Sequence, residues 1–92
     1  MTHPETDTPE LGRLIADTRA ERALTVQQVA DRVHVTRETL SAWEHDRHVL
    51  PVTKVRPLAV ALGISWREIA AARAHDIRLR RRARLLDLGE NA

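Results

Sequence analysis

Residues 36–48, TRETLSAWEHDRH, carry side chains that can recognise a ligand by hydrogen bonding. Arg37, Glu38 and Ser41 stand near the start of this stretch. A guanidinium offers a planar fork of donors, a carboxylate accepts hydrogen bonds, and a hydroxyl does both. Groups of this kind match fixed donors and acceptors on a surface, so the stretch predicts recognition and not a chemical reaction.

Nothing in the sequence predicts catalysis or metal binding. There is no nucleophile beside a plausible base, no glycine-rich phosphate loop, no acidic pair that periodicity would bury, and no cysteine. His45 and His48 straddle the predicted end of a helix and have no third ligand at a suitable spacing. We therefore expect a protein that is not an enzyme and holds no metal or cofactor.

The size and composition of the chain favour one small helical domain. Its 92 residues allow one modest core, and the only aromatic residues are Trp43 and Trp66. A core of Leu, Ile, Val and Ala suits helices packed on helices. Residues 1–10 are polar and acidic, and no apolar run approaches the ~18 residues of a membrane span. We expect a cytoplasmic protein without membrane contact.

Helix-start signals recur at short intervals along the chain, and no stretch alternates for long enough to predict a strand. The expected starts are Thr8 with Pro9, Thr25 with Gln28, Thr36, Thr53, and Ser65 with Glu68. The second and the last of these are capping boxes, and Gly63 ends the fourth helix as a left-handed cap. The fold class predicted is all-α, with five short helices.

Two of these helices, residues 26–33 and 36–45, are joined by only a few residues around Val35. So short a connection forces a sharp crossing and turns Val35 inward. Leu40 and Trp43 then hold the second helix on the core, and its N-terminal turn is free to project. This is the geometry of a helix-turn-helix, whose second helix can lie in a DNA major groove.

Residues 24–65, LTVQQVADRVHVTRETLSAWEHDRHVLPVTKVRPLAVALGIS, resemble the Cro/repressor (XRE) family of helix-turn-helix DNA-binding domains. With the flanking helices the resemblance spans residues 9–70 and includes Pro51 and Gly63. It implies a compact five-helix bundle of the lambda-repressor-like type, here with an extended C-terminal helix. It also implies binding to operator DNA, usually as a dimer, and a small phage-type repressor or Cro-like protein fits this description.

The resemblance also assigns roles to single positions. It implies a structural salt bridge between Arg19 and Glu44. The family usually has Gly where His34 and Asp46 stand, so we expect a left-handed backbone at His34, which His tolerates better than bulky apolar residues. Many members carry Gln where Val26 stands, so a phosphate or base contact is lost at that position.

Four residues of the second helix are candidates for reading DNA bases. Arg37 can pair bidentately with guanine, a contact worth about 1–3 kcal/mol of discrimination, or it can be a solvated arginine. Glu38 can accept from cytosine, favour the helix dipole, or orient Arg37. Ser41 and Ala42 can approach a base edge or a thymine methyl, or only let the backbone come close.

A second group of residues is predicted to contact DNA phosphates through side chains or helix N-terminal N–H groups. These residues are Gln27, Gln28, Thr36, Thr39, Arg47, His48 and Lys54. The alternative for the first members is plain helix capping, which is favoured for Gln28. The alternative for the last three is that they are ordinary surface residues.

Most of the basic excess lies in the tail, since residues 77–92 carry a charge of +3 and residues 1–76 carry −1. If the last helix continues, one stripe holds Trp66, Ile69, Ala70, Ile77 and Leu88, and a second stripe almost opposite holds Leu79, Ala83 and Leu86. One side can pack on the domain, so the second stripe predicts a partner helix, most simply that of a second protomer. The alternatives are fraying after residue 77, or phosphate contact by residues 78–84.

The chain thus divides into a flexible N-terminus (1–7), a helix-turn-helix DNA-binding domain (8–76) and a basic C-terminal helical extension (77–92). The function predicted is a sequence-specific regulator of transcription that binds double-stranded DNA as a homodimer at the nucleoid, most simply a repressor occupying its operator. The alternative is an antitoxin or protein-interaction module that uses the same DNA-binding head and binds a partner protein through its C-terminal helix.

Overall fold

The computed structural model describes residues 10–90, and the side chains of residues 10–87. Within this range the chain forms α-helices and one short 3-10 helix, η2, and no strand. The elements are α1 (Leu11–Glu21), α2 (Val26–Arg32), α3 (Arg37–Glu44), η2 (Val52–Lys54), α4 (Val55–Leu62) and α5 (Trp66–Glu90). The predicted all-α fold is confirmed. Helix α5 has 25 residues and continues well past residue 77, so it is not one of the short helices, and the expected extension of the C-terminal helix is confirmed.

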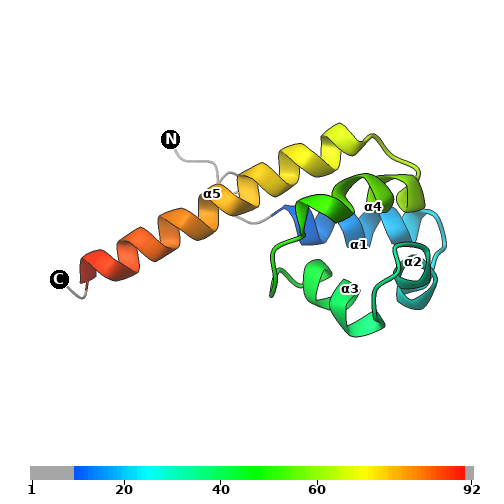
Figure 1. The fold of residues 1–92 in the computed structure, drawn as a ribbon, viewed down its shortest axis with the longest axis horizontal. Helices are drawn as coiled ribbons and strands as arrows, with labels where there is room; N and C mark the ends of the chain where they lie inside the picture. Colours follow the sequence, from blue (N-terminus) through cyan, green and yellow to red (C-terminus); the bar gives the residue numbers. More distant parts are fainter. Residues whose placement is uncertain (1–9, 91–92) are drawn as a thin grey trace.

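Helices α1 to α4 form a rounded body, and α5 runs along one side of it and projects beyond it (Figure 1). Helix α3 lies on the side of the body away from α5 (Figure 1). Helix α1 packs against α3, α4 and α5, and α2 packs against α3 and α4. The face of α3 that points away from the body is therefore not covered by α5.

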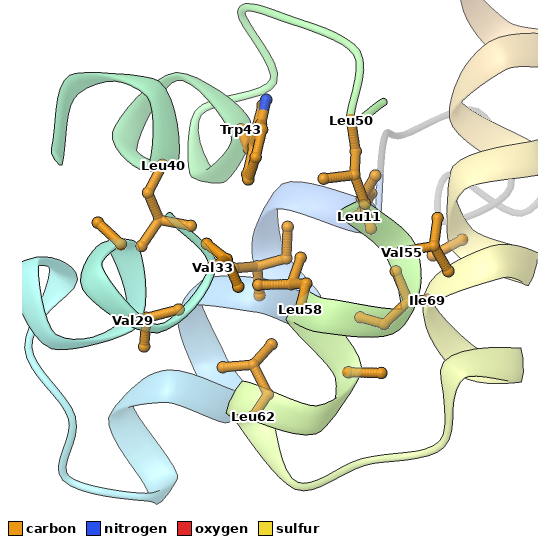
Figure 2. Packing of buried hydrophobic residues seen from close by; sticks show 14 residues of the cluster. Leu11, Val29, Val33, Leu40, Trp43, Leu50, Val55, Leu58, Leu62 and Ile69 are labelled. Carbon is orange, nitrogen blue, oxygen red and sulfur yellow. The ribbon is translucent and has the colours of Figure 1, made fainter. Parts of the chain in front are cut away.

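The core is aliphatic, as the composition predicted, with Trp43 as an aromatic member. Figure 2 shows Leu40 and Trp43 pointing from α3 into the body, toward Val33 and Leu58. The other buried apolar members are Leu11, Ile15, Val29, Ala30, Leu50, Val55, Ala59, Leu62, Ile69 and Ala72. Trp66, which was expected to face the domain, is instead 37% exposed. The guanidinium of Arg56 lies 4.4 Å from its ring centroid, so a cation–π contact holds Trp66 at the surface.

Helices α1 to α4 all end at a residue with left-handed backbone. These residues are Ala23, His34, Asp46 and Gly63, with φ angles of 55°, 59°, 57° and 69°. At each end the following N–H bonds to a carbonyl five residues back, as Val35 does to Ala30 at 3.0 Å. This is the Schellman motif, which satisfies the last free carbonyls of a helix. The left-handed conformation expected at His34 is confirmed.

The helix starts agree with the sequence in most places. Thr25 and Gln28 form the predicted capping box, and the Thr36 hydroxyl caps α3 by accepting from the Thr39 N–H at 3.1 Å. Helix α4 begins after the turn of η2, two residues later than expected. The Ser65 hydroxyl accepts from the Arg67 N–H at 3.1 Å, one residue before the position that a capping box with Glu68 requires.

Three expectations fall wholly or partly outside what the structure describes. Thr8 and Pro9 lie outside the described residues, and α1 begins at Leu11 after Glu10. The flexible segment predicted for residues 1–7 also lies outside them. The side chain of Leu88, assigned to the stripe that faces the domain, is likewise not among those described.

Candidate nucleic-acid interface

Helices α2 and α3 are joined by the sharp turn that the sequence predicted. His34 reverses the chain with its left-handed backbone, and Val35 packs half-buried against the core. The Lys54 ammonium donates a hydrogen bond to the Val33 carbonyl at 2.9 Å. This contact ties η2 to the end of α2, so the loop after α3 supports the turn before it.

The first turns of α3 bring several predicted contact residues together. Arg37 and Glu38 are exposed and Ser41 is half-buried. These three residues and Arg47 line one shallow hollow of about 230 Å³. A guanidinium, a carboxylate and a hydroxyl therefore meet on one patch, which has both the donors and the acceptors that base edges require.

The assignment of Ala42 to base reading needs correction. Its exposed fraction is 7%, so it counts among the buried residues of α3. Little of its surface is open to a base, so we remove Ala42 from the candidates for base reading. His45 belongs near this patch, because its Nδ1 lies 2.8 Å from the Ser41 carbonyl oxygen and 3.4 Å from the Ser41 hydroxyl. The sequence predicted no role in DNA contact for His45.

Two of the candidates for phosphate contact at the helix starts, Thr36 and Gln28, take part in capping. Thr36 caps α3, and its hydroxyl lies 2.8 Å from that of Thr39, which is half-buried. Gln28 accepts from the Thr25 N–H at 2.8 Å in the capping box. Gln27 is exposed and donates to Asp31 at 2.8 Å. Capping is therefore confirmed for Thr36 and Gln28, and phosphate contact by these residues stays a prediction.

The candidates in the loop after α3 differ from one another. Arg47 and His48 are exposed, and Arg47 lines the same hollow as Arg37. Lys54 is half-buried, and its bond to the Val33 carbonyl gives it a structural role that the sequence did not predict. We therefore treat Arg47 and His48 as the candidates beside the base-facing patch.

The ion pair expected between Arg19 and Glu44 is present. Arg19 Nε donates to Glu44 Oε2 at 2.7 Å, and Nη2 donates to Oε1 at 3.1 Å. The Glu44 side chain is only 5% exposed. The hydrogen bond to Glu44 raises the pKa of Arg19 above its ordinary value. The pair fixes the last residue of α3 to α1, and it does not face the outer side of α3.

Gly12 is a site residue that the sequence analysis missed. It is buried in the first turn of α1, where its N–H donates to Asp46 Oδ1 at 3.1 Å. A Cβ at this position would overlap the Glu44 carbonyl oxygen. Glycine here lets α1 approach the end of α3 closely. The available signal was a glycine inside a helix, which lowers helix propensity and often marks such an approach.

Among residues 10–90 no group of His, Asp and Glu side chains is placed to hold a metal ion. In the same range no helix is both long and apolar enough to cross a membrane.

The short turn, the buried Leu40 and Trp43, and the free outer face of α3 define a helix-turn-helix DNA-binding domain. The comparison with known families agrees, since the model of the family described as "Helix-turn-helix domain" matches residues 10–72. The chain belongs to this family. No curated protein and no solved structure matches the chain.

Proposed function

We propose that this protein is a sequence-specific regulator of transcription of the Cro/repressor (XRE) type, which represses by occupying operator DNA. The observation that carries the proposal is the patch at the start of α3, where Arg37, Glu38 and Ser41 line one hollow. The same helix is fixed from behind by Leu40, Trp43 and the ion pair at Glu44. Rigid support behind and free polar groups in front are what base recognition requires.

In this proposal α3 enters the major groove with its N-terminal turn leading. Arg37 pairs with a guanine, and Glu38 accepts from a neighbouring cytosine or holds Arg37 in place. Arg47 and His48 contact the backbone beside the groove and set the register. Because Ala42 is buried, base reading is concentrated in the first turns of the helix. The proposal assigns the chain no catalytic activity and places it on genomic DNA in the cytoplasm.

We further propose that the protein binds as a two-fold dimer through α5. Two recognition helices need half-sites about 34–36 Å apart, so something must fix the separation of the protomers. Leu79, Ala83 and Leu86 line a groove of about 460 Å³ together with Asp46 and the buried Asp76, so this stripe lies on the side of α5 that meets the body and not opposite it, as was expected. Leu86 is 64% exposed, and burying such a side chain contributes about 1.5–3 kcal/mol. The α5 helix of a second copy supplies the matching apolar stripe.

The test is selection of bound sequences from a pool of random duplexes. The expected product is a palindrome whose half-sites are 10–10.5 base pairs apart, centre to centre. Wild-type protein that enriches no sequence would overturn the proposal. The Arg37→Ala variant serves as the matched control, and it should lose preference at one base pair of each half-site.

In the alternative proposal the protein is an antitoxin or interaction module, which binds its partner protein through the same groove. In that case the α5 stripe remains uncovered until a different protein binds it. Sedimentation of the purified chain separates the two proposals. A dimer supports the homodimeric repressor, and a stable monomer supports the module that binds a partner protein.

A further inference from the structure

The inner face of α5 carries two charged residues near the middle of the helix, Asp76 and Arg80. Asp76 is only 1% exposed, and its carboxylate is held by Arg80 one turn later. Arg80 Nε lies 3.1 Å and 3.0 Å from the two carboxylate oxygens. Ile77, which was expected to face the domain, is 37% exposed. At this point the side of α5 that meets the body therefore holds an ion pair of a buried Asp76 and a half-buried Arg80, where an apolar contact was predicted.

This ion pair reaches the end of the recognition helix. Arg80 Nη2 donates to the Asp46 carbonyl oxygen at 2.7 Å. Asp46 is the left-handed residue that follows α3 and its C-cap His45, and its side chain accepts from the Gly12 N–H. Further along the same loop, Arg73 Nε donates to the Leu50 carbonyl oxygen at 2.6 Å. Two arginines of α5 thus hold the loop that follows α3.

The energetics of the pair indicate a role beyond stability. A buried carboxylate is costly without a partner, and a buried ion pair often adds no more stability than apolar side chains of similar volume. What an apolar pair cannot do is donate to a backbone carbonyl. The Asp76 carboxylate sets the direction of the Arg80 guanidinium, and the guanidinium fixes the position of Asp46.

We propose that Asp76 and Arg80 position α3 for base reading, with Arg80 as a positioning residue that acts through Asp46. The inference rests on the proposed function, because it assumes that α3 reads DNA. Helix α3 is about 12 Å long at 1.5 Å per residue. A shift of Asp46 that tilts this helix therefore also moves Arg37, which lies at the opposite end. Hydrogen bonds to base edges tolerate only a few tenths of an ångström.

The inference predicts a particular pattern of loss. Exposed, flexible side chains such as Arg47 can follow a phosphate when the helix tilts, but bidentate contacts to a base cannot. Removing Arg80 should therefore weaken binding to the selected sequence and leave binding to scrambled DNA nearly unchanged. Loss of a phosphate contact would weaken both kinds of binding, since phosphate contacts carry no sequence information.

The experiment measures dissociation constants for Arg80→Ala on two duplexes, one with a single selected half-site and one scrambled. A single half-site is used because Arg80 also lines the groove proposed for dimerisation. The matched control is Arg78→Ala, which removes an exposed arginine from the same helix. We expect at least a tenfold loss for Arg80→Ala on the half-site, less than a twofold loss on scrambled DNA, and less than a twofold loss on either duplex for Arg78→Ala.

Two further measurements keep the test independent of stability. Arg80→Lys retains the charge but not the fork, so it should fold and still lose at least threefold on the half-site. Amide NMR resonances of Gly12 and of residues 37–46 should shift in both Arg80 variants and stay in place in Arg78→Ala.

Equal losses on both duplexes, or unmoved resonances beside a lowered affinity, would overturn the positioning role. Wild-type binding without preference between the two duplexes would overturn the proposed function itself. Preference that is retained in both Arg80 variants would overturn only this inference.

Discussion

Arg19 and Glu44 join α1 to the last residue of the recognition helix α3 through two parallel hydrogen bonds of 2.7 Å and 3.1 Å. Arg19 also donates to the Leu24 carbonyl oxygen at 2.9 Å. One guanidinium therefore connects α1, the turn after it and α3. Because Glu44 is almost completely buried, its carboxylate depends on Arg19 for its charged partner.

Removing either member of this pair should destabilise the protein. Arg19→Ala leaves a buried carboxylate without its partner, and we expect a loss of about 2–4 kcal/mol in the free energy of unfolding. Glu44→Ala should cost less, because Arg19 keeps some exposure to solvent. Urea denaturation measures both, and the double variant should cost less than the sum of the single changes. Strictly additive losses would contradict the contact.

Arg37→Ala should weaken binding to the selected operator by about 1–3 kcal/mol and relax preference at one base pair. The reason is that Arg37 is exposed in the first turn of α3 and has a fork that matches guanine. Arg13→Ala is the control, since Arg13 is an exposed arginine of α1, a different helix from the one that reads DNA. Equal losses of affinity for operator and scrambled duplexes would show that Arg37 contacts phosphate.

Ala23→Gly should raise the free energy of unfolding by about 1 kcal/mol. Ala23 adopts a φ of 55°, where a Cβ is strained and glycine is not. The matched control is Ala20→Gly, an exposed position inside α1, where glycine should destabilise by about 1 kcal/mol. Thermal denaturation followed by circular dichroism shows whether each variant is more or less stable than the wild type. Two changes of the same sign would contradict the strain at Ala23.

Gly12→Ala should destabilise the protein by about 1–3 kcal/mol, the usual cost of overpacking. The added methyl would overlap the Glu44 carbonyl oxygen and lie 2.7 Å from Asp46 Oδ1. Ala16→Ser is a control for a small addition on the same helix at a half-buried position. Urea denaturation measures the change, and a Gly12→Ala variant as stable as the wild type would show that the end of α3 can move aside.

The local signals in the sequence were enough to predict the helix-turn-helix. Thr25 and Thr36 satisfy free N–H groups at the helix starts, and His34 stands where the family has glycine, so the bounds of α2 and α3 follow to within a residue. The contacts of Gly12 with Asp46 join residues 34 positions apart, and no local pattern encodes them.

The tail shows a different limit of sequence reasoning. A reading of helical periodicity assigns apolar residues to the inside and charged residues to the outside. It therefore placed Ile77 inward and did not predict that Asp76 lies buried between α5 and the body. Only the structure shows that Arg80 neutralises this carboxylate and makes its burial possible. Trp66 was misplaced for a related reason, since the cation–π contact with Arg56 is not part of an apolar pattern.

Leu79→Gln combined with Leu86→Gln should convert the proposed dimer into a folded monomer. Both residues line the groove beside α5, and a polar side chain there would be desolvated in the dimer without a matching partner. The control is Leu85→Gln, because Leu85 is 63% exposed, about as much as Leu86, but is not part of the groove. Sedimentation should give a monomer for the double variant and a dimer for the control, with normal helix content in both.

The monomer should bind one half-site as the wild type does and lose most of its affinity for the palindrome, since the second half-site no longer adds to binding. A double variant that still sediments as a dimer would move the interface from α5 to the body.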